Sequence, residues 1–432
     1  ARYEGTNRMG KSRSARWVPT WNVSGAWNAH EEKFFSNLTS VLSHFTLKAS
    51  YSLTADRGPA DVTNSQAIIT SYSPYRPFTS IQESGLYIKE LENSELTYEK
   101  KHELNIGADM GFLNNRINLA VDWYKRNNYD LIGIVNTQGA GGQILKYANI
   151  ASMKSHGIEF TLSTKNIKTK DFNWNTDFIF SNAKNEVTDL KQNANVMELI
   201  SGNGFAKQGY PVRGLFSIPF VGLDKDGIPV IINEKGEATS TDINFQERQN
   251  TGFLKYEGPT DPTITGSLGN MFSYKGFRLN LFITYSFGNV IRLNPVFKAY
   301  YSDLTAMTRE FKNRWTLPGD EAKTNVPAIL SKRMYDSNED LKYAYNAYNY
   351  STERIAKGDF IRLKEISLAY DFPKAWINPL KLTDLSLKVQ ATNLFLIYAD
   401  DKLNGQDPEF FNAGGVASPV PRQFTITLRL GL

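Results

Sequence analysis

Residues 103–124 read ELNIGADMGFLNNRINLAVDWY, and this stretch decides the fold. Apolar side chains occupy every second position on both sides of Asn114-Asn115, namely Leu104, Ile106, Ala108, Met110 and Phe112 before it and Ile117, Leu119, Val121 and Trp123 after it. A period of two is the repeat of a β-strand whose two faces meet different surroundings. Two such runs joined by a tight turn predict an antiparallel β-hairpin.

The same alternation continues along the chain, for example from Phe45 to Leu53, from Phe277 to Phe287 and from Phe424 to Leu432. One segment departs from it, because Arg362 and Lys364 share a parity with Ile366. A bulge between Leu363 and Ile366 would restore the register there. Twelve strands are expected, near residues 1–9, 16–28, 44–55, 96–113, 116–133, 156–165, 172–184, 262–274, 277–289, 357–372, 383–396 and 421–432.

The composition excludes several classes of protein. With 49 basic and 44 acidic residues among 432, the net charge is +5, which is too mild for a nucleic-acid binder that depends on a basic face. Cysteine is absent, which excludes thiol catalysis and zinc–thiolate sites. Mean hydropathy is negative and no run of about 18 apolar residues exists. A membrane protein of this composition would be an alternating β-barrel.

The polar parity carries charges in mid-strand, namely Lys48, Asp109, Asp122, Glu159, Asp177, Arg278, Lys388 and Arg429. In a soluble sheet that parity would face water, so alternation alone does not separate such a sheet from a barrel. The apolar segments run about 9 to 13 residues, which is the length that a tilted membrane strand needs. Aromatic residues gather at strand ends, as at two lipid interfaces. The fold class expected is therefore all-β, an antiparallel transmembrane barrel. Its parity places Leu119, Val121, Leu279, Leu281, Leu387 and Leu428 against lipid, and Asp109, Asp122, Arg278 and Lys388 in the lumen.

Connections alternate between short turns and long loops, as between the periplasmic and extracellular ends of outer-membrane barrels. The long loops expected outside are 56–95, 134–154, 186–261, 290–356 and 397–420. Loop 290–356 is rich in aromatic side chains; its candidate contact residues are Tyr300, Tyr301, Trp315, Tyr343, Tyr345, Tyr348 and Tyr350, with Tyr335 beside them. Mutual packing, contact with a partner protein and contact with substrate all remain open for this loop.

Several motifs, taken in order, resemble one family, the SusC-like TonB-dependent outer-membrane transporters. They are RYEGTNRM at 2–9, SGAW at 24–27, LKASY at 47–51, NIGAD at 105–109, GIE at 157–159, GPTDP at 258–262, GDFIRLK at 358–364, NLF at 393–395, DPE at 407–409 and PRQF at 421–424. The last residue, Leu432, departs from the aromatic residue usual in the family.

The resemblance implies a 22-stranded barrel with an N-terminal plug, of which residues 1–432 would be the C-terminal part, with the plug and first strands absent. The start at Ala1 has no signal-peptide pattern, so either a leader has been removed or this is a later part of a longer chain. The implied function is TonB-dependent import of large nutrients, oligosaccharides or peptides, across the outer membrane of a Gram-negative bacterium, with a SusD-like surface lipoprotein as partner. No enzyme activity, cofactor or nucleic acid is implied.

The sequence leaves other interpretations open. A self-contained 12-stranded porin or enzyme would need strand 1–9 to pair with 421–432, and a secreted β-rich lectin would dissolve without detergent. Asp407 and Glu409 could be a glycosidase pair, but Pro408 between them favours a structural loop. Asp224, Asp226 and Gly227 favour a turn over a calcium loop, because Lys235 stands where the bidentate Glu would be. Gly139 to Gly142 and His30, His44, His102 and His156 are expected to be ordinary loop and surface residues.

Overall fold

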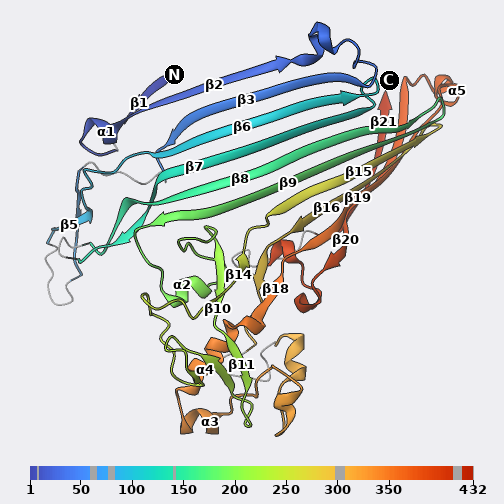
Figure 1. Ribbon diagram of the computed structural model, residues 1–432. Coiled ribbons are helices and arrows are strands. Elements are labelled where there is room, and N and C mark those ends of the chain that lie inside the picture. Colours follow the sequence, from blue (N-terminus) through green and yellow to red (C-terminus); the bar gives the residue numbers. More distant parts are fainter. Residues whose placement is uncertain are drawn as a thin grey trace.

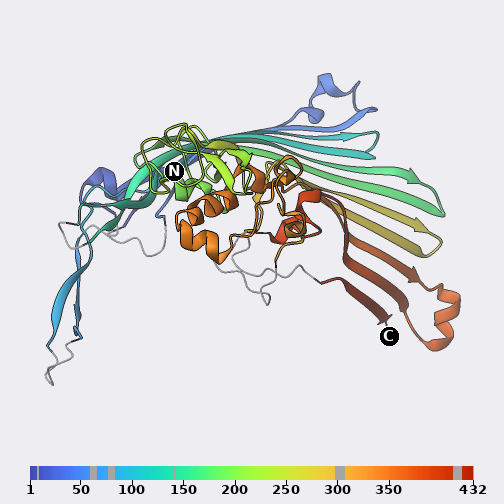
Figure 2. The same ribbon diagram turned by 90° about the horizontal axis from the view of Figure 1, so that it is seen from below.

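The computed structural model describes residues 1–6, 9–58, 66–75, 83–139, 143–296, 307–411 and 421–431. Its main feature is one curved, twelve-stranded antiparallel sheet (Figures 1 and 2). In spatial order the strands are β1 (Arg2–Gly5), β2 (Trp17–Asn28), β3 (Leu42–Asp56), β6 (Glu99–Phe112), β7 (Ile117–Asn136), β8 (Leu145–Lys168), β9 (Phe172–Leu190), β15 (Ile264–Tyr274), β16 (Phe277–Phe287), β19 (Phe360–Asp371), β20 (Asp384–Ala399) and β21 (Gln423–Gly431). The all-β prediction and the number of strands are confirmed.

β1 and β21 lie at opposite edges of this sheet, and each pairs with a single neighbour, β1 with β2 and β21 with β20. The pairing that a self-contained twelve-stranded barrel requires is thus not formed in the part of the chain that the structure describes. No helix among the described residues is long and apolar enough to cross a membrane.

The β7–β8 hairpin corrects one loop prediction. β7 runs to Asn136 and β8 begins at Leu145, so most of the expected loop 134–154 is strand. A bulge near Asp130, where Asn128 pairs with Met153 and Leu131 with Ala151, absorbs a break in the register. The strands therefore continue well past the point where the alternation of apolar residues becomes irregular, which is why the sequence alone placed their ends too early.

Register confirms the alternation between the two faces. Leu119 lies opposite Leu162, and Leu281 lies opposite Asn270 on one side and Ile366 on the other. Leu387 lies opposite Tyr370 and Leu428 in the same way. Because residues opposite each other in a ladder share a face, all six residues expected against lipid lie on one face of the sheet. We call this the apolar face and the other the polar face.

The bulge expected in β19 is also present. Phe282 pairs with Glu365 and the next residue of β16, Ile283, pairs with Leu363, so Lys364 is the extra residue. Arg362 and Glu365 thereby lie on the polar face, while Leu363 and Ile366 lie on the apolar face. The prediction of a bulge between Leu363 and Ile366 is confirmed.

Two long connections fold together into a small body at the long-loop end of the strands (Figure 1). This loop unit comprises residues 191–261, 290–296 and 307–357. Its elements are α2 (Val196–Ile200), β10 (Gly214–Ser217), β11 (Phe220–Leu223), β12 (Pro229–Ile232), β13 (Ala238–Thr239), β14 (Lys255–Pro259), β17 (Val290–Arg292), α3 (Lys332–Ser337), α4 (Leu341–Asn349) and β18 (Ile355–Lys357). Outside it lie α1 (Arg13–Arg16), α5 (Lys374–Ile377) and the hairpin β4 (Ile68–Tyr72) with β5 (Gly85–Glu90).

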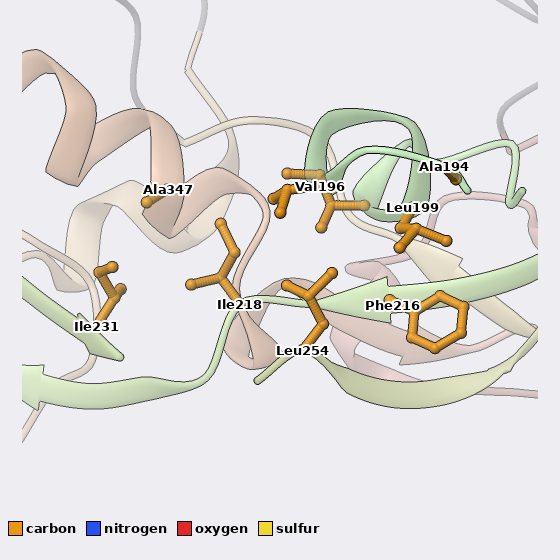
Figure 3. Close-up of a cluster of buried hydrophobic side chains, with 9 residues drawn as sticks. Ala194, Val196, Leu199, Phe216, Ile218, Ile231, Leu254 and Ala347 are labelled. Carbon is orange, nitrogen blue, oxygen red and sulfur yellow. The ribbon is translucent and has the colours of Figure 1, made fainter. Parts of the chain in front are cut away.

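The loop unit has an apolar core of its own (Figure 3). Val196 and Leu199 on α2, Phe216 on β10 and Ala347 on α4 are almost fully buried in it. The start of α2 is fixed by a capping box, in which Asn195 and Glu198 each bind the other's backbone N–H. Because the core draws side chains from both long connections, these fold as one body and not as two independent loops.

Candidate functional site

The polar face carries a balanced network of charges. Lys48 Nζ lies 2.8 Å from a carboxylate oxygen of Asp109. Asp122 faces the same lysine across Gly107, which stands between them in the ladder. A Cβ at Gly107 would lie 2.3 Å from Asp122 Oδ1, so glycine is needed here for the carboxylate to cross the strand. The side chains on this part of the polar face are thus positioned by one another.

The polar face also carries charges on the strands β16, β19 and β20. Arg278 lies opposite Ala369, which lies opposite Lys388, so the two cations share one row. Arg278 pairs with Asp371 at 2.8 Å, and Lys388 lies 3.9 Å from Glu365. These side chains are between a quarter and a half exposed, and such pairs contribute only about 0–1 kcal/mol each. All four residues expected in the lumen lie on the polar face, whose solvated charges suit a water-filled passage.

Where β19 meets the loop after β20, a buried ion pair joins two of the sequence motifs. Arg362 Nη2 donates to Asp407 Oδ1 at 2.5 Å, and Arg362 Nε lies 3.2 Å from Glu409. The Arg362 side chain is 6 % exposed and that of Asp407 10 %. Asp407 also accepts from the backbone N–H of Glu409. The two carboxylates therefore bind one guanidinium, and the structural interpretation of the DPE motif is confirmed.

Two further arginines are buried inside the loop unit. Arg292 on β17 donates to the carbonyl oxygens of Ser351, Phe216 and, at 3.4 Å, Ile200. Burial lowers the pKa of Arg292 to about 9, so its guanidinium stays charged at neutral pH. Arg354 lies 2.5 Å from Glu310 and donates to Asn294 O. The sequence did not single out these arginines, since nothing in their local spacing distinguishes them from surface arginines.

The structure separates the aromatic contact candidates of loop 290–356. Tyr345 and Tyr348 on α4 are 0 % and 1 % exposed, and burial raises the pKa of each hydroxyl above its ordinary value. They pack inside the loop unit, so of the three possibilities open for this loop, mutual packing applies to these two candidate residues, and contact with a partner or substrate does not. Tyr343 is 41 % exposed and Tyr350 is half-buried. Tyr300 and Tyr301 lie outside the described residues.

Trp315 also makes its contacts inside the loop unit. It donates from Nε1 to Glu321 at 2.9 Å, and its ring covers Gly227, where a Cβ would lie 2.6 Å from the indole. Gly227 belongs to the turn expected at 224–227, in which Asp224 Oδ1 accepts from the backbone N–H groups of Asp226 and Ile228. Within the described ranges no group of three or more His, Asp or Glu side chains could hold a metal ion.

A cavity of about 460 Å³ lies between the loop unit and the strand ends. It is bordered by Arg213 and Asp261, which pair at 2.7 Å, by Lys364 on the bulge, and by Glu409. Thr260, Ser286 and Asn289 add neutral polar groups to its wall. Thr284 and Ser286, which lie on the polar face, line the cavity together with residues of the loop unit, so the cavity adjoins that face.

No family model matches the chain. Among curated proteins, it is 25 % identical over 429 residues to TonB-dependent receptor P3 of Formosa agariphila, covering 95 % of this chain and 40 % of that protein. It is 26 % identical over 458 residues to TonB-dependent receptor SusC of Bacteroides thetaiotaomicron, covering 100 % and 41 %. The chain thus spans less than half the length of these relatives.

Among solved structures, the RagAB peptide transporter matches with a TM-score of 0.76 and 24 % identity, over 98 % of this chain and 44 % of that one. The same transporter in its open-open state matches with a TM-score of 0.76 and 23 % identity. In sequence the chain is similar to TonB-dependent receptors along nearly its whole length, and in fold it matches part of such a barrel. The family resemblance stated from the motifs is confirmed.

Proposed function

We propose that this SusC-like chain, which has the fold of a TonB-dependent receptor barrel, forms part of the wall of an outer-membrane transporter. In the whole protein, an N-terminal plug and further strands would complete a barrel of about 22 strands. Residues 1–432 would supply its C-terminal strands, with the apolar face toward lipid and the polar face toward the lumen.

The observation that carries this proposal is the division of one curved sheet into an apolar and a polar face with charges in mid-strand. Lys48 and Asp109, or Arg278 and Asp371, could leave water only at a large free-energy penalty, so the polar face must meet a solvated space while the apolar face meets apolar surroundings. On the wall of a wide lumen they stay hydrated. The arrangement of short turns at one end and the loop unit at the other supports a periplasmic and an extracellular end.

The transported substrate is proposed to be a large nutrient, an oligosaccharide or a peptide. A polar wall with balanced charges favours hydrated cargo without selecting one chemical class. The loop unit would lie at the outer mouth, where a SusD-like lipoprotein would hold cargo above the barrel. Its exposed Tyr343 is the aromatic candidate best placed for that contact, since Tyr offers a large rigid area with a polar end.

The proposal is tested in the full-length protein in its host. Deleting the TonB-contacting segment of the plug should abolish uptake of fluorescent oligosaccharides and peptides while leaving the barrel folded in the outer membrane. Affinity purification of the intact protein should recover a surface lipoprotein. Uptake that survives both the deletion and removal of TonB would contradict an energised transporter and indicate passive diffusion. Extraction of the protein without detergent would contradict the membrane location.

A further inference from the structure

A row of basic side chains crosses three neighbouring strands on the apolar face. Lys125 on β7 lies opposite His156 on β8, and His156 lies opposite Lys184 on β9. Adjacent strands are about 4.8 Å apart, so the three side chains fall within about 10 Å of one another. All three are exposed. Like charges placed directly opposite destabilise a sheet unless something offsets them.

Within the described ranges, no carboxylate offsets this row. In this part of the chain none of the three side chains forms an ion pair or a hydrogen bond, although their neighbours do. In the next row outward, Lys154 pairs with Glu186 at 3.0 Å. On the polar face, Lys48 pairs with Asp109. Lys100, further out on β6, pairs with Asp130 at 2.8 Å. Several lysines of this sheet are therefore paired with a carboxylate, whereas Lys125, His156 and Lys184 are not.

The position of the row along the strands indicates which kind of ligand it could bind. One step toward the short-turn end, the same three strands present Trp123, Ile158 and Asn182, opposite one another. Trp123 and Ile158 are 38 % and 39 % exposed, and beyond them Phe160 and Phe180 stack at 5.1 Å. Along the strands, exposed apolar side chains are thus followed by Trp and then by basic side chains. This order matches the hydrocarbon layer, the interface and the headgroup layer of a membrane.

We propose that Lys125, His156 and Lys184 bind the phosphate of a lipid headgroup in the outer leaflet. Lysine binds phosphate as a point charge, and an imidazole between two lysines adds an N–H donor. The acyl chains of the same lipid would lie on Trp123, Ile158 and Phe160. This inference rests on the proposed membrane location of the sheet but assigns a site outside the transport passage.

The test uses the full-length protein in nanodiscs of phosphatidylcholine with and without lipid A. The triple variant Lys125→Gln/His156→Gln/Lys184→Gln should bind lipid A more weakly by at least about tenfold, because each basic group near a headgroup adds to affinity. A matched control, Lys165→Gln/Lys168→Gln, removes two exposed charges from the other end of β8 and should stay within about twofold of wild type. Lys125→Arg/Lys184→Arg keeps the charges and should also bind.

Three results would overturn the site. They are equal binding of lipid A by wild type and triple variant, equal binding of dephosphorylated lipid A, and complete competition by millimolar inorganic phosphate, which would indicate a simple anion site. To show that every variant is folded, its resistance to unfolding in cold detergent is measured. The arginine variant separates an effect of lost charge from an effect of lost fold. Nutrient uptake should be unchanged in the triple variant. If the wild-type protein imports nutrients but does not bind lipid A, the lipid site is refuted and the proposed transport function is not.

Discussion

Arg362 and Asp407 lie 45 residues apart and form an ion pair that is about nine-tenths buried. The pair connects the GDFIRLK motif on β19 with the DPE motif after β20, two segments that look unrelated in the sequence. It lies at the strand ends beside the polar face, and it anchors the 401–411 segment to the sheet. The bulge at Lys364 is what directs Arg362 to this side.

Breaking this pair should loosen the 401–411 segment. Asp407→Asn leaves a buried guanidinium with only the half-exposed Glu409, and removing one partner of a buried pair costs about 3–5 kcal/mol. Amide hydrogen exchange of residues 401–411 should speed up by about 100-fold or more. Glu409→Gln is the matched control, since that carboxylate is 38 % exposed and should change exchange by less than about tenfold. Equal effects of the two substitutions would contradict the leading role of Asp407.

The two faces of β16 should respond differently to a new charge. Leu281→Arg places a guanidinium on the apolar face and should destabilise the barrel by about 2–4 kcal/mol if that position is near the membrane midplane. Asn280→Arg, one residue earlier, lies on the polar face near Glu365 and should have little effect. Urea midpoints of the detergent-folded protein measure both. Similar losses at the two positions would mean that the assignment of faces is wrong.

The bulge in β19 gives a prediction about chain length. Deleting Lys364 removes the extra residue, so Leu363 and Glu365 become neighbours and can pair with Ile283 and Phe282 in an unbroken ladder. Both halves of β19 would then keep their faces, and assembly into the outer membrane should stay near the wild-type level. Lys364→Ala keeps the bulge and should assemble equally well. A severalfold loss of assembly in the deletion variant alone would contradict this register.

The tyrosines of α4 should divide into two classes. Tyr345→Ala removes a fully buried ring and should destabilise the loop unit by about 3–5 kcal/mol, seen as faster hydrogen exchange of α4 and β12. Tyr343→Ser removes a partly exposed ring and should leave exchange nearly unchanged while reducing recovery of a lid protein. If Tyr343→Ser leaves both lid recovery and uptake unchanged, this residue has no part in lid contact.

Acid should loosen the turn at 316–320. Asp320 accepts hydrogen bonds from the backbone N–H groups of Thr316 and Leu317 and from the Thr316 hydroxyl, which together hold its pKa at about 2. Because this folded value lies below the ordinary pKa of about 3.9, the stabilisation is present above about pH 4 and is lost as the pH falls through about 2. Protection of the Leu317 amide should follow that curve. Asp320→Asn should abolish the pH dependence, whereas Glu339→Gln should keep it.

Periodicity was sufficient to predict the sheet, because each face of a strand such as β7 or β16 meets a different medium along its whole length. It even located the bulge in β19, since a charge and an isoleucine cannot share a face without one. It failed at the β7–β8 extension, where the bulge breaks the register and the consecutive apolar residues 131–135 put apolar side chains on both faces.

The loop unit was beyond reach for another reason. The contacts of Arg292 with Ser351 and Phe216 join residues that are 59 and 76 positions apart, and no local pattern encodes such a meeting. The same holds for the burial of Tyr345.

Arg292 ties its own strand to carbonyl groups of both long connections, and Ile218 and Tyr350 are joined through their backbones at 3.0 Å. A change in the structure of one connection therefore alters the contacts of the other. During divergence, insertions that reshape the mouth of such a barrel must arise in compatible pairs. A chimera that exchanges residues 191–261 between relatives should thus fold only when the segment around 290–357 comes from the same donor. The two connections are therefore expected to evolve together.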